Sequence, residues 1–275
     1  MSSIDIHESE DKTIGTNETN KNPSLFVIIP GFGAPHRDEK FRILRKNIEC
    51  LHRNSSFSKI SIRVCCYDPE CASKIDKELW QYPSIEWIFR RGIVGQYIHQ
   101  YATPKDVEGY DYVMVLLDDV ELMEDVDMTK MILYQKQLRL DIITPCMTTN
   151  SKYQYQYMLH QPNQPFQLKI VAACEAFCYF MPVDSYVKYH AIIEPEDNPW
   201  LWGVDLVLYK YYRFHIAVLN TMRMHHHYKG ECYAMRQDKQ PTEGYNSVLR
   251  KYNANSQDFE HMQAVLFFVF ANSGL

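Results

Sequence analysis

The sequence predicts an α/β fold in which a mostly parallel central sheet is flanked by helices. Short apolar runs, each the length of a buried strand, alternate with segments whose apolar residues recur at helical spacing. Several runs end in glycine or aspartate, at the carboxyl edge of the sheet where such folds bind ligands. The 275 residues contain no repeat and no linker, so we expect one domain over residues 23–275, after a disordered polar leader at residues 1–22.

The individual elements follow from the same patterns. Apolar runs predict strands at Leu25–Pro30, Ile60–Tyr67, Ile85–Phe89, Tyr112–Leu117, Asp141–Cys146 and Phe214–Met224, and a long strand or strand pair at Lys169–Met181. Helical spacing predicts helices at Asp38–His52, Cys71–Leu79, Met128–Leu140, Asp184–Ala191 and Gly203–Arg213. The polar stretch Gly230–Asn255 predicts a loop, and Asp258–Phe270 a closing helix.

Composition excludes several classes of protein. A net charge of -5 gives no electrostatic basis for binding nucleic acid. No apolar stretch reaches the roughly 18 residues that span a bilayer, and the N-terminus lacks a signal-peptide pattern, so we expect a cytoplasmic protein with no membrane span. The eight cysteines form no paired CxxC motifs, which favours buried free thiols over a zinc site.

The strongest motif is the acidic end of the run Tyr112–Leu117, where Asp118, Asp119 and Glu121 follow. Carboxylates at the end of a buried strand are costly unless a cation neutralises them. A hard divalent cation bound to phosphates would do so, and a solvated acidic turn is the alternative.

A run of three histidines, His225, His226 and His227, follows the last predicted strand. Because neighbours on a strand alternate sides, at most two can share a site. An imidazole added to carboxylates gives a ligand shell acceptable to Mn²⁺ or Mg²⁺, and a solvated surface run is the alternative.

Two further aspartates have both a functional and a structural interpretation. Asp205 ends the motif Trp202-Gly203-Val204-Asp205, where it could act as a general base beside an aromatic platform for a sugar ring, or as a first-turn acid of a helix. Asp68 is placed to bind a base or ribose, or to start an Asp-Pro turn. No GxGxxG, P-loop or GxSxG motif is present.

Taken in order over residues 25 to about 230, these features resemble glycosyltransferases of the GT-A fold. The matching segments are Pro30-Gly31, Asp68, Arg91–Gln96, Asp118–Glu121, Trp202–Asp205 and the histidine run. The sequence is similar to a poorly characterised family with a strand-end acidic motif and WG-x-D, and to small stand-alone enzymes of large algal DNA viruses that help build capsid glycans. The resemblance implies a single GT-A-like domain with a Rossmann-like nucleotide-binding half and an acceptor half, acting in the host cytoplasm if viral.

The resemblance also implies roles for individual residues. Asp119, with Asp118 or Glu121, would hold Mn²⁺ or Mg²⁺ and the donor diphosphate, and His226 would be the late ligand, with His225 and His227 as alternatives. The donor would contact Pro30, Gly31, Asp68, Arg91, Gly95, Gln96, Asp118 and Trp202. Asp205 would be the catalytic base of an inverting enzyme. The family motif usually has two acids two residues apart, whereas this chain reads Asp118-Asp119-Val120-Glu121. Either Leu117 replaces the first acid, or the pair is Asp119 and Glu121.

The implied activity is transfer of a sugar from a nucleoside-diphosphate donor to an acceptor hydroxyl. By resemblance the donor is a UDP-sugar, either a pentose such as xylose or a hexose, and the acceptor an oligosaccharide or glycoprotein. One alternative is a nucleotidyltransferase or sugar pyrophosphorylase, which would want a glycine-rich basic loop where this chain has Pro30–Arg37. The other is a non-catalytic carbohydrate-binding protein.

Overall fold

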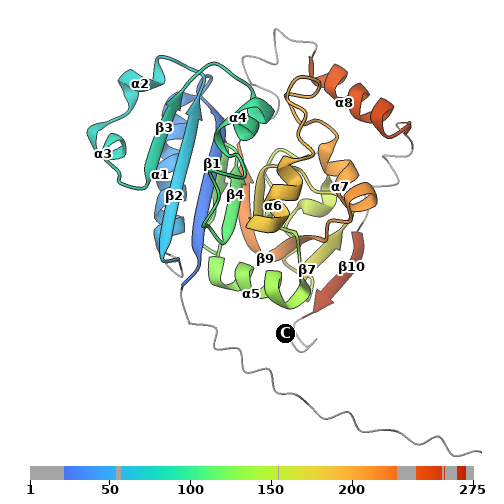
Figure 1. Ribbon diagram of the computed structural model, residues 1–275. Coiled ribbons are helices and arrows are strands. Elements are labelled where there is room, and N and C mark those ends of the chain that lie inside the picture. Colours follow the sequence, from blue (N-terminus) through green and yellow to red (C-terminus); the bar gives the residue numbers. More distant parts are fainter. Residues whose placement is uncertain are drawn as a thin grey trace, which may run out of the picture.

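The computed structural model describes residues 22–53, 57–153, 155–227, 240–255, 257 and 265–270, so nearly all of the predicted leader lies outside the described residues. In this part of the chain, ten strands form one sheet in the order β10-β7-β9-β6-β8-β4-β1-β2-β3, with β5 paired to β9 (Figure 1). The strands are β1 Ser24–Phe32, β2 Lys59–Cys66, β3 Ile85–Phe89, β4 Tyr112–Leu116, β5 Val120–Leu122, β6 Ile142–Met147, β7 Phe166–Val171, β8 Cys178–Pro182, β9 Ile216–His226 and β10 Val265–Phe270. The helices are α1 Arg37–Arg53, α2 Cys71–Lys74, α3 Lys77–Trp80, α4 Val94–Tyr101, α5 Met128–Leu138, α6 Val183–His190, α7 Val204–Tyr212 and α8 Gln240–Lys251, with a 3₁₀ turn η1 at Gln156–Met158.

The N-terminal half of the sheet is parallel, because β3, β2, β1 and β4 all run in one direction. β1 and β4 are buried along their length, which is why both read as continuous apolar runs. The C-terminal half is mixed: β8 joins β4 antiparallel, and β6 and β9 are parallel to each other. The parallel half brings the carboxyl ends of β1, β2 and β4 to one edge.

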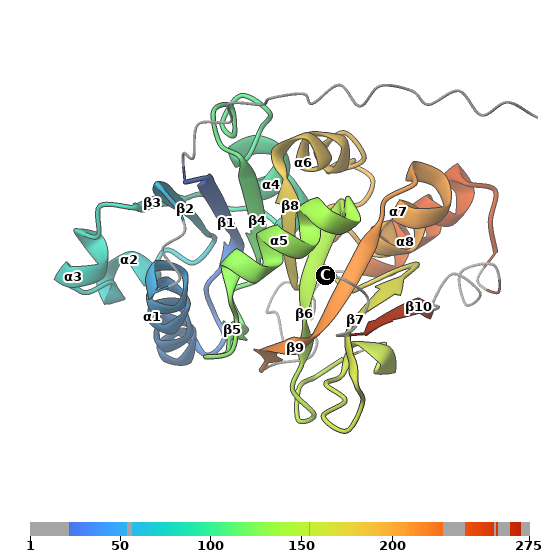
Figure 2. The same cartoon turned by 90° about the horizontal axis from the view of Figure 1, so that it is seen from below.

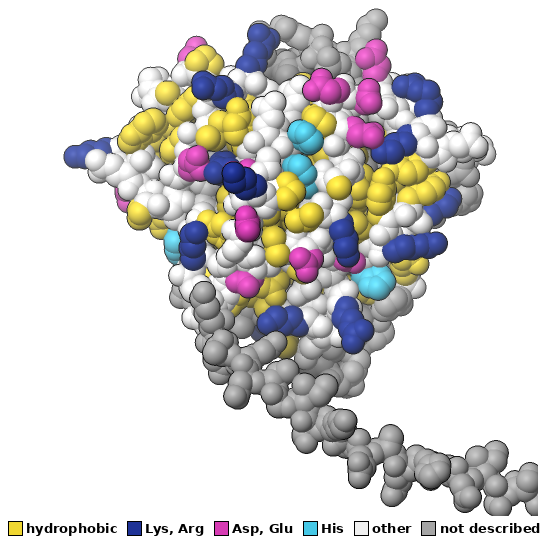
Figure 3. Space-filling view, in the orientation of Figure 1, with side chains coloured by type: hydrophobic (Ala, Val, Ile, Leu, Met, Phe, Trp, Pro, Cys, Tyr) yellow, Lys and Arg dark blue, Asp and Glu magenta, His cyan; other side chains and the backbone are white. Residues whose placement is uncertain are grey.

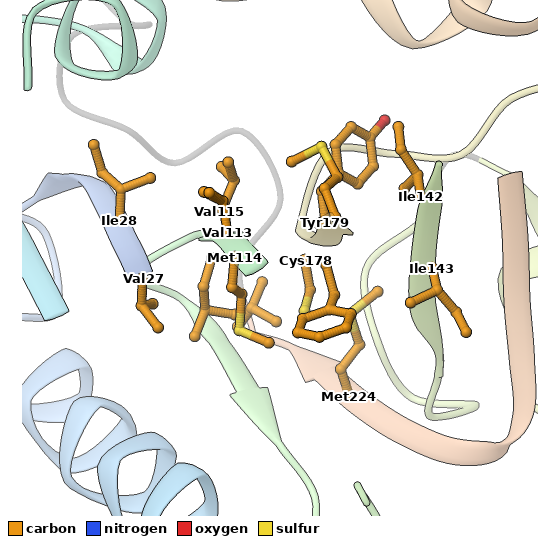
Figure 4. Packing of buried hydrophobic residues seen from close by; sticks show 14 of the residues in the cluster. Val27, Ile28, Val113, Met114, Val115, Ile142, Ile143, Cys178, Tyr179 and Met224 are labelled. Atoms are coloured by element: carbon orange, nitrogen blue, oxygen red, sulfur yellow. The ribbon is translucent and has the colours of Figure 1, made fainter. Parts of the chain in front are cut away.

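Helices cover both faces of the sheet. α1 packs on one face, and α4 and α6 pack on the opposite face (Figure 2). Side chains of the central strands alternate accordingly: Val27 and Met114 point to one side, and Ile28 and Val115 to the other (Figure 4). All four are at most 1% exposed, so the sheet's centre is the hydrophobic core.

Several sequence predictions are corrected by the structure. The polar stretch expected as a loop contains α8, and the expected closing helix contains strand β10, with residues 258–264 outside the described part. The acidic turn after Leu117 includes the short strand β5, and helix α4, which the pattern did not predict, begins inside the segment Arg91–Gln96. The expected strand pair at Lys169–Met181 is present as β7 and β8.

Seven of the eight cysteines lie in the described residues, and all seven are buried free thiols, as predicted. On the face shown in Figure 3, lysine and arginine side chains are interspersed with acidic ones. Within the described ranges, no helix combines the length and apolarity needed to cross a bilayer.

Candidate active site

A cavity of about 620 Å³ opens at the carboxyl ends of β1 and β4. Its lining comes from the β1–α1 connection, the residues after β4, the segment between β6 and η1, the end of β9 and the segments that precede β8 and α7. Thr242 and Tyr245 of α8 complete it. Among the residues predicted for the site, Pro30, Gly31, Asp118, Asp119, Trp202, Asp205 and His226 line this cavity.

Asp119 and His226 lie next to each other in the lining of the cavity. The distance from Asp119 Oδ2 to His226 Nε2 is 3.3 Å. Nδ1 of His226 lies 2.6 Å from the backbone carbonyl of Lys152, so a proton on Nδ1 is fixed there and Nε2 faces Asp119. Burial alone would disfavour the imidazolium, but the Asp119 carboxylate outweighs it and raises the pKa of His226.

This pair fits a divalent cation that completes its shell with other ligands. A carboxylate oxygen and an oriented imidazole nitrogen suit Mn²⁺. Among the described residues, no group of three or more histidine, cysteine or acidic side chains forms a closed metal cage. A cation held by Asp119 and His226 would therefore keep positions open for water or for oxygens of a ligand.

Glu121 and His227 do not line the cavity but lie against α1. The Glu121 carboxylate accepts hydrogen bonds from Arg42 at 2.8 Å and Lys46 at 2.6 Å, and its Oε2 lies 3.1 Å from Nε2 of His227. Burial by itself would raise the pKa of Glu121, but the two cations lower it to about 2. Glu121 therefore fastens β5 to α1, away from Asp119.

His225 is also turned away from His226. Its Nδ1 lies 2.6 Å from Thr148 Oγ1 and 3.2 Å from Ser151 Oγ, and its ring centroid is 4.3 Å from that of His227. Burial lowers the pKa of His225. The three histidines thus alternate along the chain, with His226 alone of them in the cavity wall.

Asp118 holds the turn that follows β1. Its carboxylate lies 2.7 Å from the Lys40 ammonium and accepts a hydrogen bond of 3.2 Å from the backbone N–H of Gly33. Burial raises the pKa of Asp118, and Lys40 partly offsets that rise. Gly31 has φ +87°, a conformation that favours glycine, and its backbone forms part of the cavity wall.

Asp68 does not line the cavity but is hydrogen-bonded to the same turn. Its carboxylate accepts hydrogen bonds from Arg37 and from the backbone N–H groups of Ala34 and Glu70. Burial opposes ionisation, but the Arg37 guanidinium and the Glu70 N–H lower the pKa of Asp68. A Cβ at Gly33 would lie 2.7 Å from Cβ of Asp68, so this position has no room for a side chain.

Of the predicted segment Arg91–Gln96, Val94 lines the cavity, whereas Arg91, Gly95 and Gln96 do not. Arg91 is exposed, and Gln96 accepts a hydrogen bond of 3.1 Å from the Ile93 backbone at the start of α4. The N–H of Gly95 donates to the carbonyl of Pro199 at 2.7 Å, and a Cβ there would lie 2.8 Å from that oxygen. α4 thus holds the segment that carries Trp200 and Trp202, which do line the cavity.

Asp205 lies at the start of α7, on the cavity wall beside Tyr155. The Tyr155 hydroxyl donates a hydrogen bond of 2.5 Å to Asp205 Oδ2. Burial raises the pKa of Asp205 to about 6, while the bonds from Tyr155 and from backbone N–H groups of α7 limit the rise. The carboxylate is therefore mostly ionised at neutral pH and basic enough to accept a proton.

Sequence reasoning missed several residues of this cavity. Tyr155 and Lys40 reach it through long-range contacts that no local pattern reveals. Glu175 did give a signal, because it is a lone charged residue in the apolar stretch between β7 and β8, and it lines the cavity. Phe177, two residues later, packs its ring 4.1 Å from that of His226.

Two solved structures that share this architecture contain a uridine nucleotide by their descriptions. The structure is similar to that of GalNAc-T7, solved with UDP, GalNAc and Mn²⁺, with a TM-score of 0.59 and 11% identity over 86% of this chain and 50% of that chain. It is also similar to S. aureus TarS 1–349 in complex with UDP-GlcNAc, with a TM-score of 0.54 and 13% identity over 87% of this chain and 69% of that chain. The protein has the GT-A fold.

The predicted α/β class and GT-A-like architecture are thereby confirmed. This GT-A chain spans half the length of the GalNAc-T7 chain that it matches. No protein-family model and no curated protein sequence matches it. At these identities the likeness establishes the GT-A fold, and the chemistry has to be argued from the cavity.

Proposed function

We propose that this protein is a divalent-metal-dependent glycosyltransferase that moves a sugar from a UDP-sugar donor to a hydroxyl of an oligosaccharide or glycoprotein. The observation that carries the proposal is that one cavity contains two chemically different groups. Asp119 and His226, 3.3 Å apart, are suited to bind a cation, and the Asp205 carboxylate, whose pKa burial raises to about 6, is suited to act as a base. A hexose and a pentose donor are both consistent with a cavity of about 620 Å³.

The metal-binding pair would bind the diphosphate of the donor. We assign Asp119 and His226 as the protein ligands of Mn²⁺ or Mg²⁺, and Leu117, which also lines the cavity, as the residue that replaces the first acid of the motif. A bound cation would compensate the charge that develops on the departing nucleoside diphosphate. The glycine turn at Gly31, held by Asp118 and Lys40, would let the backbone approach the donor closely.

Asp205 would activate the acceptor. The acceptor hydroxyl gives its proton to Asp205 as its oxygen bonds to the anomeric carbon. The bond from that carbon to the diphosphate oxygen breaks on the opposite face, so UDP leaves and the configuration inverts. Trp202, whose side chain is 45% exposed at the cavity, is suited to stack on a sugar ring.

Calorimetry on the full chain tests the proposal. We expect UDP to bind in the presence of Mn²⁺ and to bind at least tenfold more weakly without it. Asp119→Ala should abolish the metal dependence, whereas Glu124→Gln, an exposed carboxylate beyond β5, should preserve it. Absence of UDP binding at millimolar concentration with Mn²⁺ would contradict the proposal.

Product analysis then identifies the reaction. Incubation with UDP-sugars and a mixed glycan acceptor should release UDP and add one sugar mass to the acceptor, and Asp205→Asn should stop the addition while UDP binding persists. Release of pyrophosphate would instead indicate a nucleotidyltransferase. Sugar binding with no turnover would indicate a carbohydrate-binding protein.

A further inference from the structure

Lys169 of β7 is a buried cation that does not line the cavity. Its side chain is only 1% exposed, in a strand that is otherwise mostly apolar. Its backbone pairs with Val218 of β9 on one side and with Phe268 of β10 on the other, so its position in the sheet is fixed. Burial disfavours the ammonium and lowers the pKa of Lys169, so hydrogen bonds have to compensate.

Those hydrogen bonds go to the end of the 3₁₀ turn η1. Nζ of Lys169 donates to the backbone carbonyl of Tyr157 at 2.5 Å and to that of Leu159 at 3.2 Å. The last carbonyls of a helical turn have no partner within the turn, so a cationic donor satisfies them well. Lys169 thus fastens η1 to a strand inside the sheet.

Tyr155 immediately precedes η1, and its position depends on that of the turn. Its carbonyl accepts the Met158 N–H at 2.9 Å, and its ring stacks on that of Tyr157 with centroids 5.5 Å apart. The Tyr155 hydroxyl donates to Asp205 Oδ2 at 2.5 Å. A continuous series of contacts therefore joins Lys169 to the carboxylate that serves as the base in the proposed mechanism.

We propose that Lys169 is a positioning residue: by holding η1, its ammonium directs the Tyr155 hydroxyl at Asp205. The catalytic consequence rests on the proposed function, in which Asp205 is the base. A hydrogen bond weakens steeply as its length and angle depart from the optimum, so a small displacement of η1 is enough to weaken this one. A lysine that only stabilised the fold would leave Asp205 unaffected.

The titration of Asp205 reports on this contact, because a hydrogen bond to a carboxylate favours its charged form. Glu175, whose Oε2 lies 3.5 Å from the Tyr155 N–H nitrogen, is the same in every variant compared. The other ionisable groups that interact with Asp205 stay neutral over the assay range, since burial raises the pKa of each: Tyr157, Cys174, Tyr179 and Tyr189.

The test follows the titration of the Asp205 carboxyl by NMR, on the full chain with isotope-labelled aspartate, and Asp205→Asn identifies its signal. Lys169→Met keeps an unbranched side chain of similar length but removes the ammonium donors. We expect it to raise the Asp205 titration midpoint by roughly 0.5–1 pH unit, part of the shift that complete loss of the bond in Tyr155→Phe would give. The double variant Lys169→Met/Tyr155→Phe should titrate like Tyr155→Phe alone, because the bond that Lys169 directs is already absent.

Asn220→Ala is the matched control. Asn220 of β9 is buried and exchanges hydrogen bonds of 2.9 and 3.0 Å with the backbone of Gln161, so it holds the same segment beyond η1. Its loss should lower the melting temperature without moving the Asp205 titration. If Lys169→Met does not fold, Lys169→Gln, which is neutral and shorter, provides the same comparison.

Three results would overturn the proposal: an unchanged Asp205 titration in the Lys169 variant, an equal shift in Asn220→Ala, or a further shift in the double variant. The NMR titration needs no turnover, so it decides the positioning role even if no sugar is transferred. Absence of transfer would refute the proposed function separately. In the active enzyme, the acidic limb of kcat/KM should move with the titration, while the affinity for UDP with Mn²⁺ stays the same.

Discussion

Replacing Tyr155 with phenylalanine should move the pH dependence of transfer, because the Tyr155 hydroxyl is hydrogen-bonded to the proposed base, Asp205. Its hydroxyl donates to Asp205 Oδ2 at 2.5 Å, and the pKa of Asp205 is about 6. Burial, reinforced by the Asp205 charge, raises the pKa of Tyr155 far above its ordinary value, so the phenol remains a donor at every useful pH. Tyr155→Phe removes a hydrogen bond that stabilises the ionised carboxylate more than the neutral acid.

The size of the shift follows from that bond. A hydrogen bond to a charged group contributes about 1.5–3 kcal/mol, and about 1.4 kcal/mol corresponds to one pKa unit. Loss of the bond should therefore raise the pKa of Asp205 by roughly 1–2 units. A base works when it is deprotonated, so activity is present above its pKa and is lost as the pH falls through it. At pH 7 the variant should lose roughly half to nine-tenths of kcat/KM and recover it at higher pH.

The assay is the pH profile of kcat/KM at saturating Mn²⁺, which reports the pKa of the free enzyme's base. The wild-type acidic limb should fall near pH 6. Tyr157→Phe is the matched control, because the Tyr157 ring stacks on Tyr155 but its hydroxyl donates to the Ala173 carbonyl at 2.7 Å. An acidic limb that stays near pH 6 in Tyr155→Phe, or that moves equally in Tyr157→Phe, would refute the reasoning.

Two further substitutions test how the site is supported. Gly33→Ala should lower the melting temperature and weaken UDP binding, since its Cβ would lie 2.7 Å from Asp68 and 2.9 Å from the Tyr67 ring. Gly109→Ala is the control, because Gly109 also has a positive φ but a Cβ there would meet nothing within 4 Å. Equal effects of the two substitutions would show that the clash at Gly33 is not the cause. Glu121→Gln should destabilise the protein at pH 7 by roughly 1–3 kcal/mol, because its pKa is lowered from 4.5 to about 2 in the folded state. That contribution is present above pH 4.5 and disappears towards pH 2, so acid unfolding curves of the wild type and the variant should converge there, and curves that stay equally far apart would contradict the assignment.

Buried strands were the part of the fold that the sequence revealed best. β1 and β4 are covered on both faces, so their residues had to be apolar throughout. The prediction failed where local pattern and context disagree. The apolar run at Val265–Phe270 fits a helix or a strand equally well, and its pairing with β7 decides for the strand. α8 was missed because its sequence is mostly polar.

Part of the candidate site could also be predicted from the sequence, because some of its residues lie at the ends of recognisable elements. Asp119, Asp205 and His226 follow or precede recognisable elements, and they do line one cavity. Sequence could state that adjacent histidines point to opposite sides, but which one faces the cavity depends on the register of β9 with β5. The separation of Glu121 from Asp119 depends on that same pairing. The hydrogen bond from Tyr155 to Asp205 joins residues 50 positions apart, which no local pattern reveals.

The alternation of the three histidines gives β9 a double attachment. His226 lies 3.3 Å from the Asp119 carboxylate, and the next residue, His227, lies 3.1 Å from the Glu121 carboxylate, which binds α1. A shift of α1 would therefore be transmitted within one residue of backbone to the imidazole beside Asp119. Substitutions in α1 should therefore alter the affinity of the proposed Mn²⁺ site.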